Sequence, residues 1–194
     1  MSTAASSADE WIELYNHSDQ EIDLSGWTIT RATDDGESVM VRLEAGTVAP
    51  GATFLIANYA PDDERSRLAD TPQLVDAAIS LPNSKLQLRL YDGDPEANAQ
   101  LIDMADDGKG APFAGDSQMK YAMVRIDFTQ DGTLASSWDT AREASGWDAE
   151  SAELGTPGSI PAYLKPTSQK TESARATSIA PVSWAVFKHK FSKK

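Results

Sequence analysis

The chain has 194 residues, of which 40% are hydrophobic, enough for one domain of ordinary size with a buried core. It contains no cysteine, which excludes disulfides, thiolate metal ligands and a cysteine nucleophile. No stretch approaches the roughly 18 consecutive apolar residues of a membrane-spanning helix, and the first residues lack the basic and apolar regions of a signal peptide. We therefore expect a folded, soluble chain without a transmembrane segment.

The net charge of −13 is unevenly distributed along the chain. Residues 1–160 hold 10 Lys and Arg against 29 Asp and Glu, a balance of −19, whereas residues 161–194 hold 7 against 1, a balance of +6. An acidic body repels the phosphate backbone, so nucleic-acid binding by residues 1–160 is not expected. Abundant Asp and few Lys suit a solvated surface in a salty or extracellular medium, which suggests an extracytoplasmic or cell-surface location.

Residues 1–8 are small and polar and show neither alternation nor helical periodicity, which predicts a loop. Residues 9–30 then predict two strands and a turn. Within Trp11–Tyr15, aromatic or acidic residues at odd positions alternate with aliphatic residues at even positions. A second extended run, 22–29, is interrupted at Ser25 and Gly26, and the residues 16–20 before it are typical of turns.

This opening resembles that of a lamin tail domain of the bacterial type. The similarity lies in Glu10–Asn16, which reads EWIELYN, and in Asp23–Ile29, which reads DLSGWTI. The resemblance implies an all-β fold, an immunoglobulin-like β-sandwich. It also implies an interaction or architectural module, with no catalytic residues to carry over.

Further strands are predicted by alternation and by turn signals at intervals of 8–12 residues. Trp27–Leu43 is expected to form a hairpin, and the polar segment 59–72 to form a surface loop. The other expected strands cover 53–57, 86–91, 100–105, 118–128 and 137–141, with a bulge or two-sided burial in 118–128. Residues 155–159 resemble the closing Thr-Pro-Gly segment of the same family, so the sandwich is assigned to residues 9–160.

The remaining residues are divided into a linker and a tail. Residues 161–181 are Pro, Ser, Thr, Gln, Lys and Ala without a period, which predicts an unstructured, flexible linker. Residues 182–194 interleave apolar residues such as Trp184 and Phe187 with lysines. This basic-aromatic tail is interpreted either as a weak ligand for an anionic surface, membrane or nucleic acid, or as a flexible soluble end.

In the proteins that this chain resembles, a strand precedes the loop that corresponds to residues 1–8. Its absence would leave an unpaired row of backbone groups beside Trp11–Tyr15, or beside a neighbour in that sheet. We favour an open edge in a truncated reading frame, and we keep pairing with another molecule as an alternative. A third possibility is that Val182–Phe191 supplies the strand, with Ala185, Phe187 and Phe191 turned inward and Trp184 and the lysines turned outward.

Catalytic groups are few in this sequence. A Ser-His-Asp arrangement needs a histidine held by packing, but the two histidines are His17, expected to be exposed in a turn, and His189, in the tail. Glu10 with Glu13, or Glu21 with Asp23, could be considered as the carboxylate pair of a glycosidase. The resemblance instead gives Glu13 a structural role, as a partner for backbone amides of the following turn. We therefore expect no catalytic residue and no enzyme.

Metal binding was considered for the acidic loops that follow the predicted strand 86–91. Oxygen ligands for a hard cation such as Ca²⁺ are offered by Asp92, Asp94, Glu96, Asp103, Asp106 and Asp107. An EF-hand loop that started at Asp92 would need glycine at its sixth position, where this chain has Ala97. Turn formation accounts for these residues without an ion, so no metal and no cofactor is predicted.

The tryptophans allow two interpretations. The body holds Trp11, Trp27, Trp138 and Trp147, of which Trp11 and Trp27 are expected in the core. A row of exposed aromatics would instead indicate a carbohydrate-binding face. Together these features predict a non-catalytic binding or architectural module that contacts an unknown protein or surface, as a fragment of a larger surface-associated polypeptide. The alternative is a hydrolase or carbohydrate-binding domain that uses exposed carboxylates and aromatics.

Overall fold

The computed structural model describes residues 9–165 and 182–187. Two β-sheets pack face to face and a two-stranded ribbon lies beside them, which makes an immunoglobulin-like β-sandwich. The described residues contain no α-helix. They include three single turns of 3₁₀-helix, Pro95–Ala97 (η1), Ala135–Ser137 (η2) and Ala162–Leu164 (η3).

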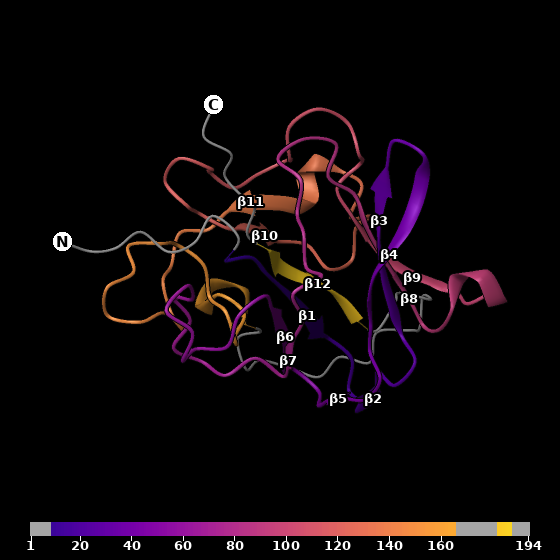
Figure 1. Cartoon of the computed structure of the whole chain (residues 1–194), viewed down its shortest axis with the longest axis horizontal. Coiled ribbons are helices and arrows are strands. Elements are labelled where there is room, and N and C mark those ends of the chain that lie inside the picture. Colours follow the sequence, from indigo (N-terminus) through magenta and orange to yellow (C-terminus); the bar gives the residue numbers. More distant parts are fainter. Residues whose placement is uncertain (1–8, 166–181, 188–194) are drawn as a thin grey trace.

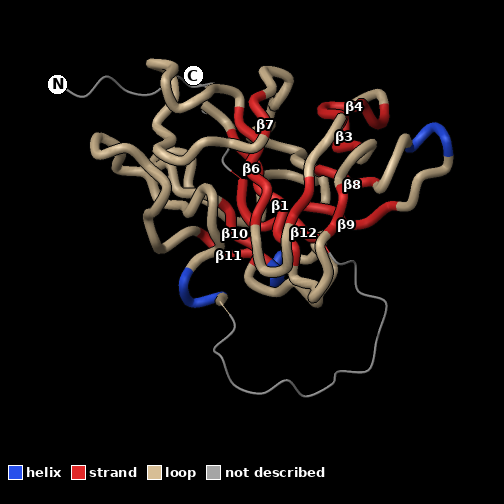
Figure 2. Tube along the Cα trace, turned by 90° about the horizontal axis from the view of Figure 1, so that it is seen from below, coloured by secondary structure: helices blue, strands red, loops and turns tan. Residues whose placement is uncertain are grey.

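The larger sheet has six strands in the order β11-β10-β12-β1-β6-β7, and in Figure 2 they run through the middle of the molecule with loops around them. Every neighbouring pair is antiparallel except β6 and β7. In chain order the strands are β1 (Trp11–Asn16), β6 (Thr53–Ala57), β7 (Leu74–Val75), β10 (Met123–Arg125), β11 (Trp138–Thr140) and β12 (Val182–Phe187).

The smaller sheet has four antiparallel strands in the order β4-β3-β8-β9. They are β3 (Thr28–Thr33), β4 (Gly36–Arg42), β8 (Leu88–Tyr91) and β9 (Leu101–Ala105). The ribbon pairs β2 (Ile22–Asp23) with β5 (Thr47–Val48). The expected hairpin is therefore confirmed as β3 and β4, and the run predicted at 53–57 is β6 with the same bounds.

Both faces of β1 are buried, which explains the alternation in its sequence. Ile12 and Leu14 face the main core between the two sheets. Trp11 and Tyr15 face a second apolar cluster on the other side of the larger sheet, where Leu68 comes from the long loop after β6. That loop, predicted to lie on the surface, thus contributes a buried anchor. Burying each large apolar side chain contributes about 1.5–3 kcal/mol, so β1 is a main source of stability.

The strand predicted at 118–128 is wrong in its extent, because only Met123–Arg125 forms a ladder. The carboxylate of Asp116 accepts hydrogen bonds from the amides of Gln118 and Met119, and Met119 is 56% exposed. A turn therefore replaces the first half of the expected strand. The predicted two-sided burial is confirmed, since Met123 faces the main core and Val124 faces the second cluster.

The C-terminal segment supplies the strand beside β1. β12 pairs antiparallel with β1 on one side and with β10 on the other, and Leu14 lies opposite Trp184. The expectation of an open edge beside β1 is therefore wrong. The expected direction of Trp184 is also wrong, because its side chain is fully buried in the main core.

Three further expectations fall wholly or largely outside the described residues. They concern the loop at 1–8, the linker from residue 166 onward, and the tail beyond Phe187 with Phe191 and the lysines.

Candidate functional site

Glu13 ties β1 to a turn that is distant in the sequence. Its Oε2 accepts a hydrogen bond of 2.6 Å from the amide of Gly158, and its side chain is fully buried. Gly158 has a φ of +86°, and an added Cβ would lie 2.7 Å from a carboxylate oxygen of Asp70. The structural role expected for Glu13 as a partner for a backbone amide is confirmed, but the turn is at 155–159 and does not follow β1.

The protonation of Glu13 is strongly perturbed. Burial raises the pKa of Glu13 well above its usual value, and the negative charge of Asp70 raises it further. The amide of Gly158 and the hydroxyl of Thr53 act in the opposite direction. The Glu13 carboxyl group has no contact with solvent, so a substrate could not reach it. Its role is to hold β1 to the turn at 155–159.

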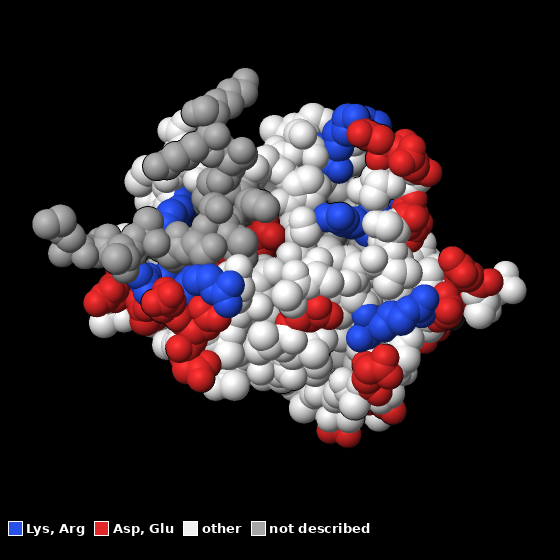
Figure 3. Space-filling view, in the orientation of Figure 1, with Lys and Arg blue, Asp and Glu red and all other residues white. Residues whose placement is uncertain are grey.

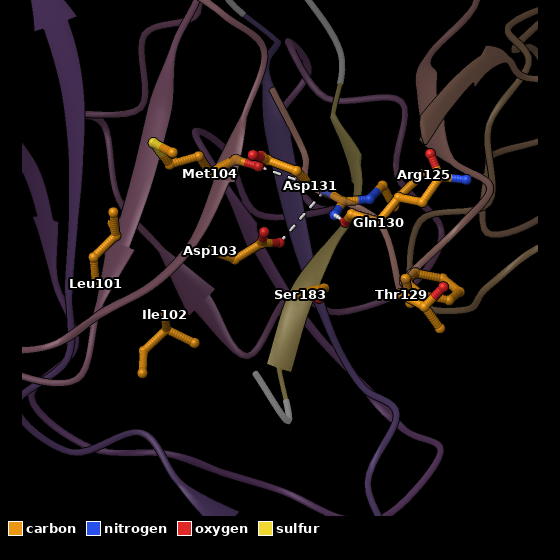
Figure 4. Close-up of a pocket in the computed structure, with 10 residues that line it drawn as sticks. Leu101, Ile102, Asp103, Met104, Arg125, Thr129, Gln130, Asp131 and Ser183 are labelled. Carbon is orange, nitrogen blue, oxygen red and sulfur yellow. Dashed lines mark hydrogen bonds and ion pairs between the residues drawn. The ribbon is translucent and has the colours of Figure 1, made fainter. Parts of the chain in front are cut away.

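A second buried charge, Arg125 of β10, lies where β9, β10 and β12 meet (Figure 4). Its guanidinium donates to the carbonyl oxygens of Asp127, at 2.8 Å, and Gln130, at 2.6 Å. A longer contact of 3.5 Å reaches the carbonyl of Met104, and an ion pair of 3.5 Å joins it to Asp103. Arg125 therefore fixes the loop after β10 against the edge of β9.

Asp103 connects this charge to the C-terminal strand. Its Oδ2 accepts a hydrogen bond of 3.1 Å from the backbone amide of Trp184. That amide lies beyond the described pairs of the ladder between β10 and β12, which join Met123 to Phe187 and Val124 to Val186. A side chain of the smaller sheet thus satisfies a backbone donor of β12 that this ladder does not reach.

The pair is held in a low-dielectric setting. Burial raises the pKa of Asp103, while Arg125 and the amide of Trp184 lower it. Burial also lowers the pKa of the Arg125 guanidinium, and Asp103, Asp131 and Asp127 raise it. Each charge is compensated by neighbours, so the junction is a structural network of the kind that holds buried ions in place.

A shallow cavity of about 300 Å³ opens beside this junction. Both Asp103 and Asp131 line it, and Ser183 reaches it from β12 (Figure 4). Asp103 is engaged by Arg125 and Trp184, and Asp131 Oδ1 accepts from the amide and hydroxyl of Thr133. Both carboxylates therefore have partners within the chain. This arrangement does not resemble a general acid and a general base that face a bound substrate.

The acidic residues considered as metal ligands serve separate turns. Asp92 accepts from the amide of Gln100, Asp94 caps η1 through the amide of Glu96, and Asp106 accepts from the amides of Asp107 and Phe113. In the part of the chain that the structure describes, no three metal-ligating side chains come together.

The other carboxylates are also engaged locally. Glu10 accepts a hydrogen bond from the amide of Leu81, and Asp23 accepts one from Ser25. Glu21 is exposed.

The tryptophans do not form an exposed row. Trp11, Trp27 and Trp138 are buried, which confirms the core interpretation for the first two, and Trp147 is partly buried edge-on against Trp11. His17, expected to be exposed, is instead half-buried. Its ring stacks on Phe128, and its Nε2 lies 3.4 Å from the hydroxyl of Ser183.

Strand β4 has the longest uncovered edge among the described strands. The outer strands of the larger sheet, β7 and β11, have only two and three residues. The edge of β9 is covered, because the amide of Asp106 donates to Gly132 and an added Cβ at Gly132 would lie 1.8 Å from the carbonyl of Met104. Along the seven residues of β4, no described backbone hydrogen bond reaches its outer side.

The surroundings of β4 carry charges of both signs, because Asp34 pairs with Lys85, Glu37 pairs with Arg89, and Arg42 of β4 pairs with Asp94. They also include one large exposed apolar side chain. Val39 is 42% exposed, and Asp34, Asp35, Glu37 and Glu44 are exposed along the hairpin and just after it. In Figure 3 acidic side chains lie among basic ones along the right-hand side of the visible face, toward which the β3–β4 hairpin lies in Figure 1. This edge therefore offers unpaired backbone groups beside the exposed acids Asp35 and Glu44.

The geometry described so far defines an immunoglobulin-like sandwich whose buried charges are structural. The family model of the Lamin Tail Domain matches residues 1–109. Because this is more than half of the chain, the protein belongs to the lamin tail domain family, whose members are immunoglobulin-like and generally serve as binding or structural modules. A search of curated proteins found no match. No helix in the described residues is long and apolar enough to cross a bilayer.

Sequence reasoning missed the most connected charged residue. Arg125 interrupts the apolar run Met123–Ile126, and a lone charge among apolar residues in a buried strand is a usable signal that was not singled out. Asp103 was considered only as a cation ligand. Its partner could not be found from spacing, because Asp103 and Arg125 lie in different sheets.

Proposed function

We propose that this chain is a non-catalytic interaction module and that it binds an extended segment of a protein partner along β4. It would act as part of a larger, extracytoplasmic or surface-associated polypeptide. The observation that carries the proposal is the uncovered, seven-residue edge of β4. Strand addition to such an edge supplies affinity through main-chain hydrogen bonds and needs no catalytic group.

The chemistry of the partner follows from the surroundings of the edge. The balance of −19 over residues 1–160 and the exposed Asp35 in the hairpin turn favour a basic segment, and exposed Val39 favours an apolar side chain at the neighbouring position of the added strand. The register of β4 on β3 shifts beside Met40, so the regular part of the edge is Gly36–Val39. A short segment with alternating lysine or arginine and β-branched residues would match it.

The family supports the same class of function. Lamin tail domains are typically non-catalytic, and the buried carboxylates of this chain fasten loops and strands to one another. The cavity beside Arg125 is lined by two carboxylates, but both are engaged by internal partners. A hydrolase is therefore the weaker explanation of these residues.

Selection of displayed peptides against the full chain tests the proposal. We expect enrichment of basic peptides with alternating apolar residues, and slower hydrogen exchange of the amides of Gly36–Arg42 when such a peptide binds. Val39→Lys places a like charge at the site and should weaken binding at least about tenfold, which corresponds to about 1.4 kcal/mol.

Val75→Lys is the matched control. Val75 is 46% exposed but lies on β7, at the far edge of the other sheet, so this substitution should leave peptide binding unchanged. Equal binding to Val39→Lys and the original chain, or a failure to enrich any peptide, would contradict the assignment of β4 as the binding edge.

A further inference from the structure

β12 occupies the centre of the larger sheet although it comes from the end of the chain. β1 pairs with β6 on its other side, and β10 pairs with β11. Among the described strands, β1 and β10 are not hydrogen-bonded to each other, and β12 joins the two halves of the sheet. The space between them is a groove with a strand edge on each side, and we call it the β1–β10 groove.

The contacts that hold β12 in this groove come from several elements of the folded body. Trp184 is fully buried in the main core, its amide donates to Asp103 of β9, and Ser183 contacts His17 from the turn after β1. The ladders to β1 and β10 add backbone hydrogen bonds. None of these contacts requires that the strand and the groove belong to the same molecule.

The segment that connects residue 165 to β12 is long enough for the strand to enter the groove of its own chain or that of another copy. Sixteen residues, 166–181, separate Lys165 from Val182. Fully extended, they could span about 50 Å at roughly 3.3 Å per residue, which exceeds the width of a small domain. Residues 161–194 carry a charge of +6 and residues 1–160 carry −19, so the C-terminal segment of one copy is attracted to the body of another.

We infer that the β1–β10 groove accepts Val182–Phe187 from a second copy of this chain, which would give strand-exchanged dimers. At low concentration the tethered strand has the advantage, because a short linker gives an effective concentration in the millimolar range. At high concentration, or on refolding, two copies exchange identical strands and make the same contacts. This surface is separate from β4, so the inference does not rest on the proposed function.

A chain that can be cut between body and strand tests the groove directly. A protease recognition sequence replaces residues 169–175 in the full chain, which is folded and then cut. A fluorescent peptide of residues 178–194 should replace the cut segment, and the same peptide with Trp184→Ala should compete at least about tenfold less well. If the labelled peptide is not taken up, even when the cut chain is refolded in its presence, the inference is overturned.

Exchange between intact copies is measured with two uncut chains of different mass. They are unfolded together and refolded at about 10 μM and about 1 mM, concentrations chosen to lie well below and near the expected effective concentration. The fraction of mixed dimer should rise with concentration, and a monomeric mass at both concentrations would overturn exchange between copies. Val39→Lys should leave the mixed dimer unchanged, which separates this result from the test of β4.

Discussion

At the scale of single residues, the buried charges of this protein serve the fold. Glu13, Asp103 and Arg125 are each fully or largely buried, and each contacts a backbone group distant from it in the sequence, namely that of Gly158, Trp184 and Met104 respectively. A buried charge that loses its partner is costly, on the order of 3–5 kcal/mol, so these contacts specify which loops and strands must meet. Sequence reasoning identified Glu13 as structural but could not locate Gly158, because 145 residues separate them.

Glu13 should make stability depend on pH. Its pKa is raised in the folded chain, so between the usual value of 4.5 and the raised pKa the folded state binds more protons than the unfolded state. The free energy of unfolding should therefore fall as the pH rises through this window. Glu13→Gln keeps an acceptor for Gly158 and removes the titrating group, so its free energy of unfolding should rise relative to that of the original chain as the pH rises through this window.

Urea unfolding of both chains at several pH values from 5 to 8 measures this difference. Asp103 also has a raised pKa, so part of the pH dependence of the free energy of unfolding should persist in Glu13→Gln. The exposed Glu21→Gln serves as the control and should follow the original chain at every pH. A constant difference between Glu13→Gln and the original chain across the series would rule out titration of Glu13 as the cause.

At the scale of elements, β12 explains both a success and a failure of prediction. Its β-branched and aromatic residues indicated a strand, and the expected place beside β1 was considered. The direction of Trp184 was wrong because strict alternation was assumed. The shift in register beside Leu14 inserts Ala185 as an extra residue, so the alternation of one end of the strand does not continue into the other. Bulges have no dependable sequence signal here.

Trp184 should be one of the most important side chains for stability. It is fully buried in the main core, so Trp184→Ala should lower the free energy of unfolding by about 3–5 kcal/mol. Its indole Nε1 has no hydrogen-bond partner in the described structure, so Trp184→Phe gives up packing volume but no hydrogen bond. We expect Trp184→Phe to cost less than about half as much as the alanine variant.

Thermal and urea unfolding of the two variants check this order. Tyr163→Ala is the comparison for loss of an aromatic ring, because Tyr163 is 46% exposed and its removal should change stability by less than about 0.5 kcal/mol. A Trp184→Ala variant as stable as Tyr163→Ala would mean that β12 contributes nothing to the core.

At the scale of the whole molecule, local sequence patterns predicted the class of fold but not how the strands of the larger sheet are joined. Alternation along β1 and β8 and the apolar run of β6 are properties of neighbouring residues, so they could be found without coordinates. The pairing of β12 with β1 and β10, and the ion pair from Asp103 to Arg125, depend on chain segments that meet only in the fold. The second apolar cluster was missed for the same reason, since loop residues such as Leu68 and Ile160 cover the outer face of the larger sheet.

The central claim is that Val182–Phe187 is an inner strand of the sandwich, and hydrogen exchange of the full chain followed by mass spectrometry tests it most directly. The amides of β12 that bond to β1 and β10 should exchange as slowly as those of β1, because both strands have partners on each side. Trp184→Ala should speed exchange in both strands together. Exchange of residues 182–187 at the rate of an unstructured peptide, while β1 stays protected, would contradict the account.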